Sequence, residues 1–488
     1  MCNSNLQHDL LSLSTGDRIY FVGIGGISMS GLAEIAKNSG FIVCGSDRHL
    51  SARTEYLEQQ GIHVHQGHLA DNLSAFKPDL VVYTAAVHAD NAELIHARET
   101  GIRTIDRASF LGWLNVQFQA VINISGTHGK TTTTALCSLM LMDTGIDPTV
   151  HLGAELKQFH GTVHLGNPGG LMVSEACEYM RGFLKFRSTT AAILNIDYDH
   201  VDCFSDLQDV IDTFTEFADQ LPETGNLVIP AFDPNVSSML HQLADRRSLR
   251  GDVMPNVWSF GLASDLVDGK KPDVYAANLV YELGLPRFDV YLQESFYAHI
   301  ELSIPGRHNV ANALAAIACA HLNGGSPESA VRVLTTYEGA EGRFTHTGTY
   351  RGALVVADYA HHPAAARATL EAASHIPHKH LWVVFQPLTY SRTKVLFNDY
   401  VSALQDCEMV IFSEIYSDRE TNPGDISSRM ICDRINELGG HAVFEESFSG
   451  IRRQLDEIVE QGDLILVLGP EDIRSFADQL TGRTDIWA

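Results

Sequence analysis

Short apolar runs rich in β-branched and aromatic residues recur along the whole chain. They lie at Arg18–Gly23, Phe41–Cys44, Leu80–Thr84, Ala120–Ser125, Leu171–Glu175, Ala191–Ile196, Ala353–Asp358, Leu381–Gln386, Met409–Ser413 and Leu464–Gly469. Segments with apolar residues at helical spacing lie between many of them, for example Ser30–Asn38 and Thr132–Met142. Because strands that alternate with helices form helix-covered sheets, this pattern predicts α/β domains with largely parallel sheets.

One region has a different pattern, with an apolar residue at every second position on both sides of Gln293–Ser295. The alternating residues are Phe288, Val290 and Leu292, then Phe296, Ala298, Ile300 and Leu302. A period of two around a short polar break is typical of two antiparallel strands. We therefore expect a hairpin added to one of the parallel domains.

Two breaks divide the chain. A new strand at Ala120 follows a helical stretch that ends near Val116, and the loop Asn323–Pro327 follows a long alanine-rich helix. A chain of 488 residues is long enough for three domains. We predict an N-terminal Rossmann-like domain over 1–118, a central P-loop ATPase-like domain with the hairpin over 119–325, and a C-terminal Rossmann-like domain over 326–488.

Composition limits the function classes. Apolar residues at 45% and charged residues at 19% are ordinary for a globular protein, whereas the formal charge of −26 argues against a nucleic-acid partner or a basic membrane-surface protein. No apolar run approaches the ~20 residues of a membrane span, so no membrane insertion is expected. Met1–Thr15 does not resemble a signal peptide, and none of the eight cysteines forms a C-x-x-C pair. A cytoplasmic protein with free thiols is expected.

The strongest local motif is Gly126-Thr127-His128-Gly129-Lys130-Thr131-Thr132, between the apolar run Ala120–Ser125 and a helical pattern. Strand, glycine loop, Lys-Thr and helix are the parts of a P-loop, in which backbone N–H groups hold phosphates. Lys130 would contact the β- and γ-phosphates, and the Thr131 hydroxyl would ligate Mg²⁺. The usual spacing places another glycine at position 124, which is isoleucine here, so the loop is a shortened variant. We expect an ATP site.

Two further residues are candidates for ligands of Mg²⁺. Glu175 ends an apolar run, and His200 follows another in Asn195-Ile-Asp-Tyr-Asp-His200. Polar groups after parallel strands gather at one sheet edge, where ligands bind. Beside a P-loop, both become credible metal ligands.

A second glycine loop lies near the start of the chain. Gly23, Gly25 and Gly26 follow the first apolar run, and Ser46-Asp47 follows the second, about 20 positions on. This resembles a dinucleotide fingerprint, but Ser28 occupies the place of its third glycine. A nicotinamide-dependent dehydrogenase is therefore one interpretation, and a site for the diphosphate of a nucleotide-linked substrate is the favoured one.

The order of the motifs is more specific than any one of them. G-I-G-G-x-x-M-S-G, G-T-H-G-K-T-T-T, E-A-C-E, N-I-D-x-D-H, G-R-H-N-V-x-N-A-L-A-A, D-Y-x-H-H-P and F-Q-P-x-x-Y-S-R-T follow one another along the chain. This succession resembles the Mur ligase family over nearly the full length. The resemblance implies an ATP-dependent ligase, with two Mg²⁺ ions, that joins L-alanine to the carboxylate of UDP-N-acetylmuramate through an acyl phosphate in peptidoglycan precursor synthesis. A recycling ligase that attaches a tripeptide to the same sugar, or a non-catalytic UDP-sugar-binding protein, is the alternative; either a monomer or a homodimer is compatible.

The resemblance also implies a role for each motif residue. The UDP-sugar would contact Gly23, Gly25, Gly26, Ser28, Ser46 and Asp47. ATP would contact Gly126 to Thr132, His308, Asn309, Asn312, Arg343 and Asp358, with Thr131, Glu175 and His200 as metal ligands. Tyr359, His361 and Arg392 would face the amino acid. Lys130, His200, Arg343 and His361 would be catalytic, with His361 or His200 as the candidate base for the amine.

The sequence departs from the family pattern at three places. Cys177 replaces an aspartate in the acidic segment, Leu388-Thr389 replaces His-Arg, and Gly469–Asp472 reads G-P-E-D instead of G-A-G-D. The loss of a cation at position 389 concerns amino-acid specificity more than ATP chemistry. Arg392 and Arg419 are the candidates to replace that contact, and glycine or L-serine are possible substrates beside L-alanine.

Overall fold

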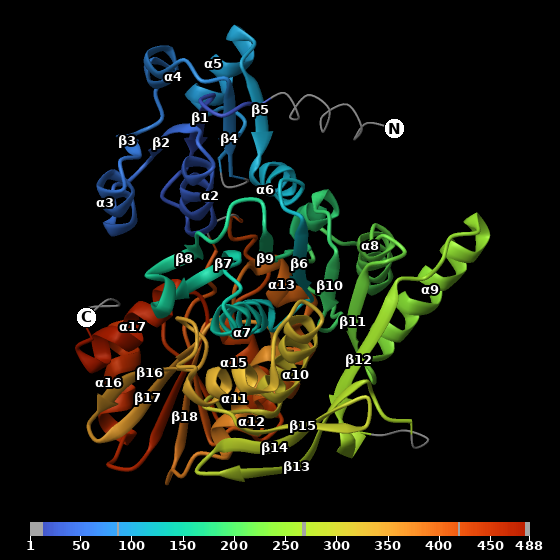
Figure 1. Ribbon diagram of the computed structural model, residues 1–488. Helices are drawn as coiled ribbons and strands as arrows, with labels where there is room; N and C mark the ends of the chain where they lie inside the picture. Colours follow the sequence, from blue (N-terminus) through green and yellow to red (C-terminus); the bar gives the residue numbers. More distant parts are fainter. Residues whose placement is uncertain (1–12, 85–86, 266–269, 418–419, 484–488) are drawn as a thin grey trace.

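The computed structural model describes residues 13–84, 87–265, 270–417 and 420–483. Three sheets follow one another along the chain, and each is covered by helices (Figure 1). The first sheet lies at the top of the view, the second runs through the middle to the right, and the third lies below at the left. The α/β architecture with largely parallel sheets is confirmed.

The N-terminal sheet has five parallel strands in the order β3-β2-β1-β4-β5. Its strands are β1 (Arg18–Val22), β2 (Ile42–Asp47), β3 (His63–Gln66), β4 (Leu80–Tyr83) and β5 (Arg103–Asp106), and its helices are α2 (Ile27–Asn38), α3 (Ala52–Gln59), α4 (Ala70–Phe76), α5 (Ala92–Thr100) and α6 (Arg107–Asn115). The strand order reverses between β1 and β4, and the glycine loop follows β1. Ligands of doubly wound sheets bind at such a reversal.

The central sheet has ten strands in the order β15-β14-β13-β12-β11-β10-β6-β9-β7-β8. These are β6 (Ala120–Ser125), β7 (Thr149–Leu156), β8 (Gly161–His164), β9 (Leu171–Glu175), β10 (Thr190–Ile193), β11 (Asn226–Pro230), β12 (Asn256–Leu262), β13 (Val274–Glu282), β14 (Leu285–Leu292) and β15 (Ser295–Glu301). Its helices are α7 (Lys130–Asp143), α8 (Leu207–Asp219), α9 (Pro234–Arg250), α10 (Arg307–His321) and α11 (Pro327–Thr336), with short 3₁₀ turns η1 (Lys157–Phe159), η2 (Tyr179–Lys185) and η3 (Ala263–Asp265). The predicted hairpin is confirmed as β14 and β15.

The C-terminal sheet has six strands in the order β16-β17-β21-β18-β19-β20, and only β16 is antiparallel to its neighbour. Its strands are β16 (Thr345–Tyr350), β17 (Ala353–Asp358), β18 (Leu381–Phe385), β19 (Met409–Phe412), β20 (Ala442–Phe444) and β21 (Leu464–Leu468). Its helices are α12 (Pro363–Ser374), α13 (Tyr390–Val395), α14 (Phe397–Leu404), α15 (Ser428–Glu437), α16 (Phe448–Ile458) and α17 (Glu471–Thr481). All ten apolar runs of the sequence form strands at the predicted places.

The buried apolar side chains show how the three parts are joined. One core cluster contains residues of both the first and the second sheet, because Phe110 and Trp113 of α6 pack with Phe183 and Phe186 around η2. The clusters of the third sheet contain only residues from Phe344 onward. The core of the third sheet is therefore separate from the cores of the first two sheets. Within the described residues, no helix is both long and apolar enough to span a bilayer.

Candidate active site

The P-loop forms between β6 and α7, as the motif predicts. Gly129 has a φ of +86°, and a side chain there would collide with Asn312 Oδ1, 2.3 Å from the position of its Cβ. The loop is also fixed to the segment after β10, since the backbone N–H of Thr127 donates to Asn195 O (3.2 Å) and that of His128 donates to Asn195 Oδ1 (2.8 Å). Glycine is needed at position 129 because the backbone turns there against α10. The backbone N–H groups at the N-terminus of α7, which follows, are suited to binding an anion.

Lys130 is held by a carboxylate that sequence reasoning did not assign. Its Nζ lies 3.0 Å from Oε2 of Glu178 and also donates to the carbonyl of Thr127 (3.1 Å). Glu178 is only 2% exposed. Burial disfavours the charge of Lys130, but the charge of Glu178 outweighs it, so the pKa of Lys130 is raised. Lys130 is therefore charged before any phosphate binds, and Glu178 already contacts its ammonium group.

The predicted metal ligands lie at the carboxyl edge of the same sheet. Glu175 ends β9, which pairs with the P-loop strand β6, and its Oε1 accepts from Gly153 N (2.6 Å). His200 Nε2 lies 3.7 Å from Glu178 Oε1, and within the described chain its buried Nδ1 has no hydrogen-bond partner. Burial lowers the pKa of His200, which favours the neutral, metal-binding form.

These donors fit Mg²⁺ that arrives with a nucleotide. The hydroxyl of Thr131 and the carboxylate of Glu175 are oxygen ligands suited to a hard cation together with phosphate oxygens, and Nδ1 of His200 is a further unpartnered donor atom. Among the residues that the structure describes, no group of three or more acidic, histidine or cysteine side chains is arranged to hold a metal ion. Phosphate oxygens would therefore have to complete the coordination.

The N-terminal half of α10 covers the other side of the P-loop. Asn312 Nδ2 donates to Asn309 Oδ1 (3.1 Å), and Asn309 Nδ2 donates to the carbonyl of Pro305 (2.7 Å). Burial lowers the pKa of His308 to about 4, so its ring is neutral. The structure thus brings these three residues, which are predicted to contact ATP, to one helix beside the P-loop.

Two predicted residues reach the P-loop from the C-terminal part. Arg343 Nη2 lies 3.4 Å from Thr131 Oγ1, and its guanidinium stacks on the Tyr359 ring, 5.1 Å from the centroid. Asp358 ends β17 and accepts from the backbone N–H groups of Phe344 (2.7 Å) and Ala360 (2.8 Å). Burial raises the pKa of Asp358. Arg343 is accordingly close to where a γ-phosphate would lie, while Asp358 shapes the turn beside it.

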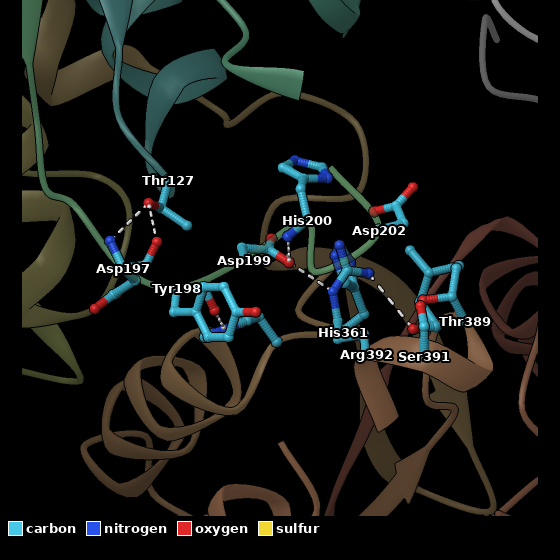
Figure 2. Close-up of polar contacts among 12 residues, drawn as sticks. Thr127, Asp197, Tyr198, Asp199, His200, Asp202, His361, Thr389, Ser391 and Arg392 are labelled. Atoms are coloured by element: carbon cyan, nitrogen blue, oxygen red, sulfur yellow. Dashed lines mark hydrogen bonds and ion pairs between the residues drawn. The ribbon is translucent and has the colours of Figure 1, made fainter. Parts of the chain in front are cut away.

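A buried ion pair joins the segment after β10 to the start of α13 (Figure 2). Asp199 Oδ1 accepts from Arg392 Nε and from the backbone N–H of His200, both at 2.6 Å. Burial alone would raise the pKa of Asp199, but the charges of Arg392 and of nearby histidines hold it well below its usual range. The structure therefore places Arg392 directly beside the predicted metal ligand His200.

His361 lies beside this pair in Figure 2 and is neutral. Its Nδ1 lies 2.8 Å from the carbonyl of Tyr359, which can only accept, so Nδ1 carries the proton and Nε2 a free lone pair. Burial and then the charge of Arg392 lower the pKa of His361 well below its usual range. In this tautomer His361 is able to accept a proton.

The first glycine loop faces an arginine and a histidine that the sequence did not reveal. Ser28, in the first turn of α2, accepts from Arg107 Nη1 (2.9 Å) and lies 3.0 Å from His151 Nε2 of β7. Asp47 Oδ2 accepts from the backbone N–H of Gly25 (2.9 Å). Ser28 and Asp47 are thus brought together with the glycines at the end of a helix that has no acidic residue in its first turn. That charge distribution suits a diphosphate.

Ser46 lies in a different environment. Its side chain is fully buried, and its hydroxyl donates to Glu93 (2.6 Å), which also accepts from Tyr20 and Asn72. Sequence reasoning did not single out Glu93, because nothing local distinguishes this helical glutamate from a surface one. The Ser46 hydroxyl stabilises the sheet here, and its backbone carbonyl accepts from Gly23 N and so shapes the loop.

The departures from the family pattern surround the same region. Leu388 and Thr389 are both buried and bring no charge to the loop before α13, whereas Arg392 does. Arg419, the other candidate for the lost cation, lies outside the described residues. Glu178 and Asp199 were within reach of sequence analysis, since each belongs to a quoted motif, but Arg107 and His151 had no such signal.

Comparison with known proteins covers most of the chain. Residues 18–119 match the catalytic-domain model of the Mur ligase family, 124–320 its middle domain and 342–470 its glutamate ligase domain. A UDP-N-acetylmuramate–L-alanine ligase of Acetivibrio thermocellus is 41% identical over 467 residues, which is 96% of each chain. One of Clostridium novyi is 41% identical over 93% of this chain and 95% of its own.

Solved structures agree with these matches. The UDP-N-acetylmuramate–alanine ligase of Thermotoga maritima superposes with a TM-score of 0.75 at 28% identity, covering 96% of this chain and 98% of that one. A murein peptide ligase of Psychrobacter arcticus gives 0.69 at 25% identity, covering 96% and 100%.

Proposed function

The chain belongs to the Mur ligase family, and from that premise we propose that it joins L-alanine to the carboxylate of UDP-N-acetylmuramate at the expense of ATP, releasing ADP and phosphate. The observation that carries the proposal is that two arginines of the C-terminal part reach the central part at its P-loop edge: Arg343 contacts Thr131, and Arg392 pairs with Asp199 beside His200. Relatives 41% identical over almost the entire chain carry the name of this reaction.

Each part of the chain would bind one substrate. We assign the UDP-sugar to residues 1–118, ATP to 119–325 and the amino acid to 326–488. Helix α11 packs against α7 and β15 of the central sheet, so within 326–488 we assign the amino-acid site to the residues after this helix. The arrangement supports closure of the C-terminal part over the nucleotide, which would keep water from the reactive intermediate.

The first step would form an acyl phosphate, because a free carboxylate is a poor acyl donor at neutral pH. The sugar carboxylate attacks the γ-phosphorus of ATP, and ADP leaves. Both reactants are anions, so Lys130 and Arg343 would neutralise the phosphates and hold them in line. Two Mg²⁺ ions, when bound by Thr131, Glu175 and His200, would supply further charge neutralisation.

The second step would form the amide bond. The amine of L-alanine attacks the acyl carbon, the carbon–oxygen bond to phosphate breaks, and the amine loses a proton. His361 is the candidate base that the geometry favours, because its Nε2 carries a lone pair while its Nδ1 is committed to Tyr359 O. His200 is less suitable, since its imidazole lies beside Glu178 in the metal region.

The reaction is tested by ADP release from ATP and Mg²⁺ with UDP-N-acetylmuramate, with and without L-alanine, glycine, L-serine or a tripeptide. We expect L-alanine to stimulate release most. A requirement for the tripeptide would identify a recycling ligase, and release stimulated by no amine would indicate a protein that only binds the UDP-sugar. Because ATP is the phosphoryl donor, we also propose that the protein acts in the cytoplasm, as a monomer or homodimer.

A further inference from the structure

The Asp199–Arg392 pair is the most deeply buried ion pair between the central and C-terminal parts among the described residues. The two side chains are 9% and 3% exposed, although the residues are separated by 193 positions. Breaking such a pair leaves a charge without a partner in a poorly hydrated place, and the pair itself seldom stabilises a fold more than an apolar contact would. Its position beside the reaction centre therefore calls for a functional reason.

The way in which Asp199 binds the guanidinium leaves the other end of the group available. The carboxylate of Asp199 accepts a hydrogen bond from Nε of Arg392, and Nη1 of Arg392 makes a long contact of 3.5 Å to the carbonyl of Leu388. Within the described residues, Nη2 has no hydrogen-bond partner. An arginine held by Nε alone presents its terminal nitrogens to a further acceptor, and a carboxylate is the acceptor that guanidinium geometry fits best.

The family resemblance implies that Arg392 faces the amino acid, and the surroundings of Arg392 are compatible with the α-carboxylate as this acceptor. Leu388 and Thr389, on the same loop, are buried and carry no charge. His361 lies beside Arg392 in Figure 2. The carboxylate of Asp199 also accepts the N–H of His200, so it fixes the metal-region loop and Arg392 to one point. Among the described residues, the apolar clusters of the third sheet contain no residue of the first two sheets, so the contact of Arg392 with Asp199 is a polar link between the C-terminal part and the segment after β10.

We infer that Asp199 is a positioning residue that holds Arg392 by Nε, so that the terminal guanidinium nitrogens receive the α-carboxylate of the incoming amino acid. The inference rests on the proposed function. It implies that the amino-acid site is complete only after the C-terminal part has docked on the segment that follows β10. Asp199 would act through Arg392 and touch no substrate itself.

The test separates the two chemical steps in the Asp199→Asn variant, which keeps the shape but loses the charge. Acyl phosphate is trapped with hydroxylamine from ATP, Mg²⁺ and UDP-N-acetylmuramate without amino acid, and amide formation is measured with L-alanine. We expect trapping within about threefold of the wild type and a KM for L-alanine at least tenfold higher. Asp202→Asn serves as the matched control, because this exposed aspartate of the same loop contacts Tyr179 instead.

A double-mutant cycle completes the test. Arg392→Lys keeps a cation but has no Nε, so we expect it to raise the same KM, and the double variant Asp199→Asn/Arg392→Lys to be no worse than either single one. Equal loss of trapping and of amide formation in Asp199→Asn would overturn the inference and leave only an interdomain contact, as would additive effects in the cycle. If the wild type shows no stimulation by any amino acid, the proposed function fails instead.

Discussion

Glu178 lies in ion-pair contact with the P-loop lysine Lys130, 3.0 Å from its Nζ, and both side chains are largely buried. A chain with a formal charge of −26 thus places a carboxylate at the position where ATP phosphates are expected. This contact keeps Lys130 charged and oriented in the absence of nucleotide, but a phosphate that approaches must share or displace it.

Removal of the Glu178 carboxylate should have opposite effects on the stability of the fold and on the affinity for nucleotide. In Glu178→Gln, Lys130 keeps its backbone acceptors but loses its counter-charge, so we expect the free energy of unfolding to fall by about 3 kcal/mol. Affinity for ADP should rise, because Lys130 then has no competing anion. Urea denaturation and calorimetric titration with ADP measure the two effects.

The control is Glu338→Gln, which removes the partner of Lys157 from an ion pair with both side chains 69% exposed. It should change stability by less than about 0.5 kcal/mol. Equal effects of the two substitutions would show that burial of the Lys130 pair has no energetic consequence.

Arg343 is expected to act on the transition state, since it reaches Thr131 from the C-terminal part. Arg343→Ala should lower kcat by about 10²- to 10³-fold, with little change in the KM for ATP. Steady-state ADP release measures both constants. Arg332→Ala, which removes an exposed partner of Asp143, should leave them unchanged. A normal kcat in Arg343→Ala would exclude contact with the γ-phosphate.

The sequence was sufficient for the parts of the fold that have strong local patterns. The ten apolar runs and the hairpin β14–β15 follow from periodicity, whereas the other strands were not predicted. Among these are β3 and β5, whose sequences H-V-H-Q and R-T-I-D contain few apolar residues. Motif spacing located the P-loop and the residues around it. It gave no indication of Arg107 and His151, which reach Ser28 only because α6 and β7 pack beside α2 in the folded chain.

Arg107 should supply much of the positive charge at the first glycine loop. In Arg107→Ala, we expect the Kd for UDP to rise about 10- to 100-fold, because a charged hydrogen-bond donor is lost beside the end of α2. The salt dependence of binding should weaken as well. Arg98→Ala, on the exposed side of the same part of the chain, is the control. Unchanged affinity in Arg107→Ala would place the diphosphate elsewhere.

His151 should make stability depend on pH. Burial, together with the charge of Arg107, lowers its pKa to about 4, below the value near 6.5 of an unfolded histidine. Between these values the unfolded chain binds one more proton, so stability falls as the pH falls from about 6.5 to 4, by up to about 3 kcal/mol for this residue. Urea denaturation across this range should give a flatter curve for His151→Gln than for the wild type. Parallel curves would show that His151 contributes nothing to the acid sensitivity.

Metal dependence distinguishes the proposed ligands from residues that only lie nearby. We expect EDTA to abolish ADP release and Mg²⁺ to restore it, because the positively charged side chains of the protein alone do not neutralise two anionic substrates. Glu175→Gln should raise the Mg²⁺ concentration needed for half-maximal activity at least tenfold, since one carboxylate ligand is lost. Binding of Mn²⁺ with ADP, followed by electron paramagnetic resonance, measures the same loss without turnover. Glu216→Gln, at an exposed position of α8, is the control for charge alone. Substantial turnover in EDTA, or normal Mn²⁺ binding by Glu175→Gln, would contradict the assignment of Glu175 as a ligand.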